Sequence, residues 1–288
     1  MNRYMRGMSN GGMIAARGAE PLTLEAIASR VPSIFAAEAH ESRSDRYAYI
    51  PTAEVLSGLM REGFQPFFAQ QSRTRVEGKE NFTKHMVRLR HQSRTNEHDE
   101  AHEIILINAH DGTSSYQMIN GVFRFVCANG LFTGDTFGET KVNHTGDAVS
   151  KVIEGAFTVL EDADRVMHDV HEMKALPLSD GEQAAFAKAV HSLRYEEEEK
   201  APVAADRLLT SRRSADAGAD LWSTFNRLQE NVIRGGQRGW VRNAEGQVRR
   251  SSVREVKGID QNRNLNRAMW TLAEEMARLK GAPLAVAA

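Results

Sequence analysis

Four stretches in the middle of the chain have the pattern of strands, and the gaps between them are too short to hold helices. These stretches are residues 66–76, 84–92, 102–110 and 115–128. An alternation of period two predicts strands, whereas parallel neighbours need a crossover of a dozen or more residues. The short gaps therefore predict an antiparallel meander, in which Asp111-Gly112 and Asn129-Gly130 form tight hairpin turns.

The segments on either side of these stretches have helical spacing. Residues 22–36 and 49–64 precede the strands, and residues 147–176, 179–195, 221–235 and 262–281 follow them. We expect Thr52 and Asp147 to be N-caps, Gly63 to end the second helix, and residues 147–176 to form one long helix before Pro177. The predicted fold class is α+β, with an antiparallel sheet at about residues 65–145, a helix before it and a helical C-terminal half.

The predicted organisation has three parts. Residues 1–20 form a flexible arm, residues 21–176 an α+β core domain that includes the sheet and the long helix, and residues 177–288 a helical region. That region carries an exposed basic loop at 235–258, with a short hairpin at Asn243 to Gly246. No apolar run is long enough to span a bilayer, the N-terminus has no signal-peptide pattern, and the single cysteine fits a reducing cytoplasm.

The sequence contains few groups with a pattern typical of catalysis. Cys127 lies within an apolar strand pattern, which favours a packing role over a nucleophile. His98 and His102 have a four-residue spacing that suits a zinc site on a helix, with Asp99 and Glu103 beside them. We interpret this stretch as a solvated polar loop, and we expect no metal. A Walker loop and a dinucleotide-binding glycine fingerprint are both absent, so we predict a protein without a cofactor that is not an enzyme.

Charge is distributed in blocks, although the net charge is only −1. Residues 73–94 contain seven Lys or Arg against two acids, residues 234–267 contain nine against three, and residues 154–199 contain twelve acids against four basic residues. Arginine suits bidentate phosphate contacts, and basic groups beside aromatic side chains are typical of sequence-tolerant single-strand binders. The predicted nucleic-acid-binding residues are Arg73, Arg75, Lys79, Lys84, Arg88, Arg90, Arg94, Arg124, Arg234, Arg238, Trp240, Arg242, Arg249, Arg250, Arg254 and Lys257.

Several segments resemble a known family. The stretches YIPTAEVLSGLMREGFQPFFAQQSRTR, KHMVRLRH, INGVFRFVCANGL, LWSTFNRLQENVIRGG and REVKGIDQNRNLNRAMWTLAEEM are similar to the phage/plasmid-like proteins of domain-of-unknown-function family 932. The resemblance covers about residues 45–280 and implies a bacterial cytosolic protein of a mobile element. The order of a helix, an antiparallel sheet and further helices is also similar to that of phage and plasmid single-strand annealing proteins, by analogy of fold alone.

These features lead to one principal hypothesis and two alternatives. The principal one is a DNA-binding protein that anneals or protects single-stranded DNA in recombination, assembles with itself as a ring or filament, and has no membrane partner. The first alternative is a protein-binding module that inhibits host defence or restriction, with Glu196 to Glu199 imitating DNA phosphates. The second is a metal-dependent nuclease that uses His98, Asp99, His102 and Glu103.

Overall fold

The computed structural model describes residues 12–16, 19–41, 49–94, 100–125, 129–132, 140–142, 148–197, 200–242 and 245–284. Cys127, His98, Asp99, Asp147 and Asn243 lie outside the described residues. The chain divides into two compact units, the first comprising residues 1–124 and 137–163 and the second residues 125–136 and 164–288. In the part of the chain that is described, no helix is both long and apolar enough to cross a membrane.

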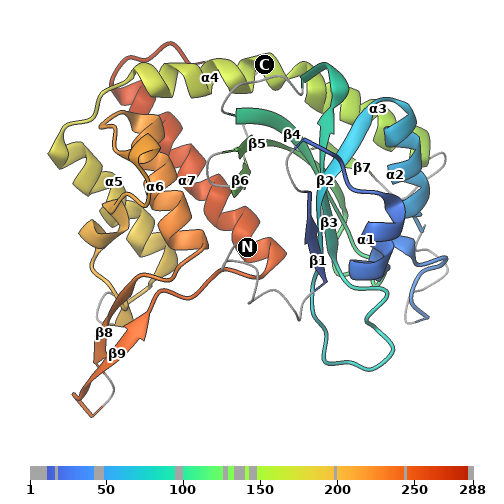
Figure 1. The fold of residues 1–288 in the computed structure, drawn as a ribbon, viewed down its shortest axis with the longest axis horizontal. Coiled ribbons are helices and arrows are strands. Elements are labelled where there is room, and N and C mark those ends of the chain that lie inside the picture. The colour runs from blue at the N-terminus through green and yellow to red at the C-terminus, as the bar shows by residue number, and fades with distance from the viewer. Residues whose placement is uncertain are drawn as a thin grey trace. The chain divides into compact units, whose positions relative to one another are not determined.

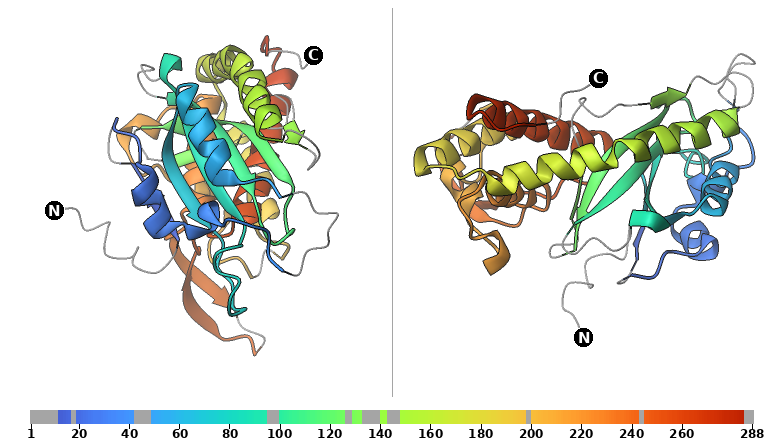
Figure 2. Two further views of the ribbon diagram at one scale, coloured as in Figure 1. Left: turned by 90° about the vertical axis from the view of Figure 1, so that its right-hand side faces the viewer. Right: turned by 90° about the horizontal axis from the view of Figure 1, so that it is seen from above.

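The first unit is an antiparallel sheet with helices on one side (Figures 1 and 2). Its elements are β1 (Met13–Ala15), α1 (Leu24–Arg30), η2 (Pro32–Phe35), α2 (Thr52–Arg61), β2 (Phe64–Gln71), β3 (His85–His91), η3 (Gln92–Arg94), β4 (Glu100–Asn108), β5 (Tyr116–Arg124), β7 (Thr140–Val142) and α3 (Ala148–Glu161). The strand order is β1-β2-β3-β4-β5, and β7 also pairs with β5. The predicted antiparallel meander and the α+β class are confirmed. Strand β1 pairs with β2 and lies within the segment that we expected to be a flexible arm.

The core of the first unit lies between the sheet and its helices. Val55, Leu56 and Leu59 of α2 are fully buried against Leu89 of β3 and Leu106 of β4. These α2 positions have the spacing of one helical face, and the strand residues share one face of the sheet. Burial of such apolar side chains is the main force that attaches the helices to the sheet.

Thr52 begins α2, but the prediction that its side chain caps the helix is wrong. Pro51 occupies the cap position, and the Thr52 hydroxyl lies in a buried polar network instead. Its Oγ1 is 2.9 Å from Nε2 of His85 and accepts a hydrogen bond of 3.0 Å from Nδ2 of Asn108. His110 also lies 3.4 Å from the same oxygen. A tertiary network on β3 and β4 thus uses the hydroxyl that local sequence reasoning assigned to the helix end.

The buried His85 makes the stability of the first unit depend on pH. Its Nδ1 donates to the Thr83 carbonyl at 3.1 Å, and burial, with a smaller effect of His110, lowers its pKa from 6.5 to about 3. Between these values the unfolded chain binds a proton that the folded chain does not, so stability falls as the pH falls below about 6.5. We expect a loss of roughly 2 kcal/mol between pH 7 and pH 5.

Urea unfolding at these two pH values measures this loss. The variant His85→Gln has no titrating group at this position, so its free energy of unfolding should change less between pH 7 and pH 5. The variant His168→Gln, at an exposed position, should keep the full dependence of the wild type. An equal pH dependence in all three proteins would contradict the assignment to His85.

Two other local predictions are wrong. The expected single helix over 147–176 is two helices, α3 and α4 (Ala163–Ala175), with Asp162 in a turn between them. Three acids in residues 161–164 disfavour a continuous helix there, because Asp has a low helix propensity and like charges three residues apart repel. Asn129 and Gly130 lie in a strand, β6 (Asn129–Phe132), rather than at a turn. Strand pairing has outweighed their turn preference.

The second unit is mainly helical, as predicted for the C-terminal half. Its elements after α4 are α5 (Asp180–Arg194), η6 (Ala205–Leu209), η7 (Ser214–Asp216), α6 (Leu221–Ile233), β8 (Arg238–Arg242), β9 (Val248–Ser252) and α7 (Ile259–Leu279). Ser179 and Glu182 form a capping box at the start of α5. The rings of Trp222 and Phe225 on α6 stack at 5.7 Å, and Trp270 of α7 meets Phe225 edge-on at 6.1 Å. These aromatic contacts join α6 to α7.

Candidate nucleic-acid interface

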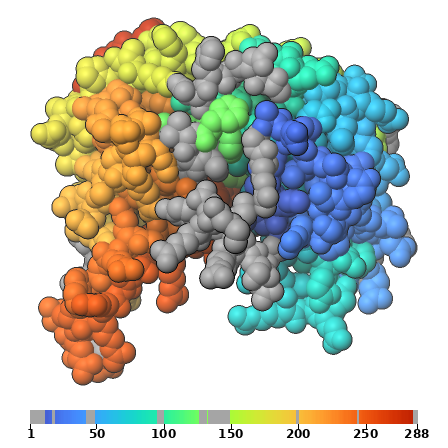
Figure 3. Space-filling view, viewed as in Figure 1, coloured from blue at the N-terminus to red at the C-terminus, as the bar shows by residue number. Residues whose placement is uncertain are grey.

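The basic segment after α6 forms a two-stranded hairpin, β8 and β9, which projects from the second unit (Figure 3). Trp240 and Val241 favour a strand, and Gly246 near the tip has φ +78°, a conformation that favours glycine. The sequence predicted a hairpin at this tip, although not the length of its strands. Trp240 pairs with Arg250, Arg238 with Ser252, and Arg242 with Val248.

This register places most of the positive charge of the hairpin strands around one exposed tryptophan. Directly paired residues share a face of a hairpin, as do residues two apart along a strand. One face therefore carries Arg238, Trp240, Arg242, Val248, Arg250 and Ser252, and we call these six residues the Trp240 face. The Trp240 side chain is 57% exposed, and the Arg250 guanidinium lies 5.4 Å from the centre of its ring. Such a face offers both a stacking surface and phosphate-binding charges.

The other basic residues of this segment surround the hairpin less closely. Arg249 lies on the opposite face and is exposed. Arg254 and Lys257 follow β9 and are exposed, and Lys257 lies 3.8 Å from Glu255. Arg234, at the end of α6, is held 3.0 Å from the buried Glu230.

Val248 is 55% exposed beside Arg242. Sequence reasoning missed this valine, which the register of an extended hairpin would have identified.

The first basic block is divided by the fold. Arg73, Arg75, Lys79 and Lys84 lie in the connection between β2 and β3, where Arg73 and Arg75 are exposed and both lysines are partly buried. Arg94 lies in η3 and is also partly buried. The strand predicted for 66–76 ends at Gln71, so these side chains belong to a loop rather than to a sheet face.

Arg88 and Arg90 of β3, two of the predicted nucleic-acid-binding residues, are buried rather than exposed to solvent. They are only 7% and 4% exposed. Their Nε atoms donate to Glu103 of β4 at 2.5 Å and 2.9 Å, respectively. The Arg90 guanidinium also lies 4.1 Å and 4.2 Å from the ring centres of Phe67 and Phe123. The carboxylate and the rings stabilise the buried charges.

The remaining predicted residues of the first unit are buried too. Arg124 is 6% exposed and lies 3.6 Å from Glu100. His102 is 1% exposed, and its Nε2 lies 2.5 Å from Oδ1 of Asn120. Burial lowers the pKa of His102. Among the described residues, no three His, Cys, Asp or Glu side chains converge as a metal site. His98, the other candidate ligand, lies outside them.

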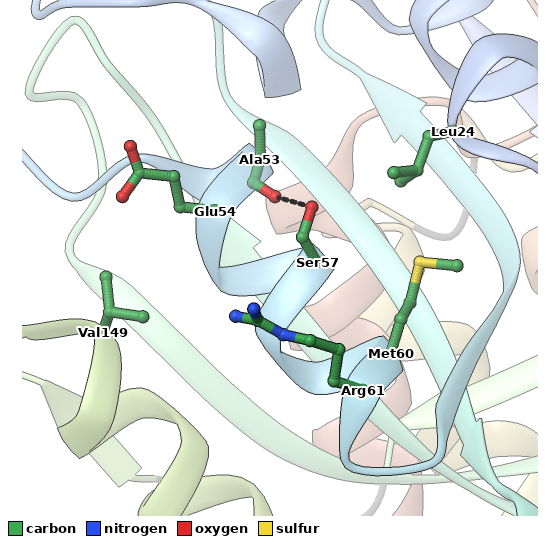
Figure 4. Close-up of a pocket in the computed structure, with 7 residues that line it drawn as sticks. All are labelled: Leu24, Ala53, Glu54, Ser57, Met60, Arg61 and Val149. Carbon is green, nitrogen blue, oxygen red and sulfur yellow. Dashed lines mark hydrogen bonds between the residues drawn. The ribbon is translucent and has the colours of Figure 1, made fainter.

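A surface hollow beside α2 is a second candidate for a binding site (Figure 4). Leu24, Met60 and Val149 give it an apolar lining, with Glu54 and Arg61 at its sides. The Ser57 hydroxyl donates to the Ala53 carbonyl at 2.8 Å, which is the usual bond of a serine to its own helix. The described residues that line the hollow include no base beside this hydroxyl. The Trp240 face therefore remains the candidate site.

Comparisons with known proteins agree on one family. The model of the family named Domain of unknown function (DUF932) matches residues 39–270. The UPF0380 protein YafZ of Escherichia coli (strain K12) is 50% identical over 256 residues, which cover 89% of this chain and 92% of the relative. The UPF0380 protein YfjQ of the same strain is 49% identical over the same shares of both chains. No solved structure matches the chain. The chain therefore belongs to the DUF932 family of proteins.

Proposed function

We propose that the protein binds single-stranded DNA through the Trp240 face and anneals or protects single strands in the cytoplasm. The exposed Trp240, with Arg238, Arg242 and Arg250 around it, is the observation that carries this proposal. A base of any identity can stack on an exposed aromatic ring, and arginines on the same face neutralise the phosphates beside it. Such a site binds a strand without reading its sequence.

Other basic residues and further copies of the chain extend this site in our proposal. Arg254 and Lys257 continue the positive charge beyond the hairpin, and Arg73 and Arg75 supply a separate exposed patch on the first unit. A single hairpin contacts only a few nucleotides. Assembly of the protein with itself as a ring or filament adds these short footprints along one strand and raises the overall affinity.

The variant Trp240→Ala tests the proposal. Loss of base stacking costs about 1–3 kcal/mol per base, so we expect a five- to 150-fold weaker affinity for a single-stranded oligonucleotide. Fluorescence anisotropy of a labelled oligonucleotide at low salt measures this change. The variant Trp240→Phe retains a ring and should lose less.

The same oligonucleotide titration can also contradict the proposed function. If the wild-type protein has no measurable affinity at low salt, or if Trp240→Ala binds as tightly as the wild type, the proposed interface is wrong. Sizing of the wild-type protein with and without a long single strand checks the proposed assembly, which predicts a ring or filament on DNA.

A further inference from the structure

A row of polar side chains on α6 is buried, although no predicted binding residue lies within it. The row is Gln229, Glu230 and Asn231, each at most 3% exposed. Nδ2 of Asn231 donates to the carbonyls of Leu208 and Thr210 at 2.7 Å and 2.9 Å. Glu230 accepts two hydrogen bonds from Arg213, at 2.6 Å and 2.8 Å. Buried polar groups require partners. Nε2 of Gln229 donates to Oδ1 of Asn266 on α7 at 3.0 Å. Glu230 and Asn231 find their partners in the segment before α6, residues 202–213, and attach it to this helix at residues 208–213.

The same segment holds the root of the β8–β9 hairpin. Nε of Arg212 donates to Oδ1 of Asn231 at 2.6 Å, and its Nη2 donates to the carbonyl of Gly235. One guanidinium thus joins the buried row to the residue where the chain turns from α6 toward β8. Nε2 of Gln237 donates to the carbonyl of Arg207 at 2.6 Å, one residue before β8 begins.

A third contact fixes the hairpin beside Trp240 itself. The backbone N–H of Trp240 donates to the carbonyl of Pro202 at 2.9 Å. The preceding residue is Gly239, and a Cβ atom at this position would overlap the carbonyl oxygen of Pro202. Only glycine allows the two backbones to approach this closely. The edge of β8 is therefore held against the segment while the Trp240 face stays exposed.

We infer that residues 202–213, fixed by Glu230 and Asn231, position the hairpin so that the Trp240 face is ready for a DNA strand. Arg212 and Gly239 are positioning residues in this arrangement. An isolated two-stranded hairpin is at best marginally stable in water, and ordering it during binding would weaken the affinity. This inference rests on the proposed function, because it assigns the buried row a role in presenting the same site.

The variants Gly239→Ala and Arg212→Ala test this inference, with Gly181→Ala as a matched control. Gly181 lies in α5, and no neighbouring atom would meet a Cβ there. We expect both test variants to bind a single-stranded oligonucleotide at least tenfold more weakly than the wild type, and the control to bind like the wild type. The fluorescence of Trp240 is isolated by subtracting the signal of the same variant that also carries Trp240→Phe. Its anisotropy should be lower in both test variants than in the wild type, because the hairpin is held less firmly. Circular dichroism should show unchanged helix content.

The outcomes separate the inference from the function on which it rests. If Gly239→Ala and Arg212→Ala keep wild-type affinity while Trp240→Ala loses it, the positioning role is wrong and the binding face stands. If Trp240→Ala also keeps wild-type affinity, the proposed function itself is wrong. Should Gly239→Ala fail to fold, Arg212→Ala and the conservative Arg212→Lys decide. Lysine can donate to the Gly235 carbonyl alone and should restore part of the affinity, whereas equal losses in both variants would contradict the bridging role.

Discussion

Replacement of Glu103 by alanine is expected to destabilise the first unit by about 3–5 kcal/mol, the typical cost of removing one partner of a buried ion pair. The carboxylate accepts hydrogen bonds from Arg88 and Arg90, and all three residues are at most 7% exposed. Without it, two guanidinium groups would stay buried without their shared counter-charge. The variant Glu103→Gln keeps the acceptor oxygen but not the charge, so its loss should be smaller.

Chemical denaturation with a secondary-structure probe measures this loss. The matched control is Glu275→Ala, which removes the partner of Arg278 in an ion pair whose side chains are 53% and 65% exposed. Exposed pairs contribute about 0–1 kcal/mol, so the control should unfold almost like the wild type. Equal stabilities of Glu103→Ala and wild type would show that the arginines of β3 do not depend on this carboxylate.

Removal of the three arginines of the Trp240 face should weaken DNA binding through the loss of phosphate contacts. At about 1 kcal/mol for each lost phosphate contact, the variant Arg238→Ala/Arg242→Ala/Arg250→Ala should bind a single strand roughly 100-fold more weakly. It should also bind with less salt dependence. Each phosphate contact contributes about 0.7 to the slope of log affinity against log salt for a single strand, so the slope should become shallower by about 2.

The control is a second triple variant, which loses the same positive charge from other positions in the second unit. Lys174, Lys188 and Arg278 are exposed, and none of them belongs to the Trp240 face. The variant with alanine at these three positions should keep most of the wild-type affinity for a single strand. It should also keep nearly all of the slope of log affinity against log salt. If both triple variants lose the same affinity, binding depends on overall charge rather than on this face.

Much of the fold could be predicted from local patterns, because these patterns and the tertiary structure agree. The segments of β3, β4 and β5 were predicted as strands and form strands, although both of their faces are buried, and Gly63 ends α2 with φ +92° as expected. The exceptions have different causes. The hydroxyl of Thr52 meets groups of β3 and β4, which are distant in sequence. Asn129-Gly130 lies in a strand, where pairing has outweighed its turn preference.

The candidate site could be predicted only in part. Trp240 and the arginines near it were identified from the sequence, because a segment rich in glycine and arginine without an apolar face is expected to lie at the surface. Arg88 and Arg90 have the same alternation as a solvent-facing strand, and only the position of Glu103 on the neighbouring strand shows that they are buried and paired. A count of charges along the chain cannot distinguish a binding surface from a buried ion pair.

Tryptophan fluorescence during titration with unlabelled single-stranded DNA tests the central claim most directly. Trp222 and Trp270 are 2% and 0% exposed, whereas Trp240 is 57% exposed, so a stacked base should quench mainly Trp240. We predict saturable quenching that weakens with salt and disappears in Trp240→Phe. Quenching that persists unchanged in Trp240→Phe, or no quenching of the wild-type protein at low salt, would contradict the account.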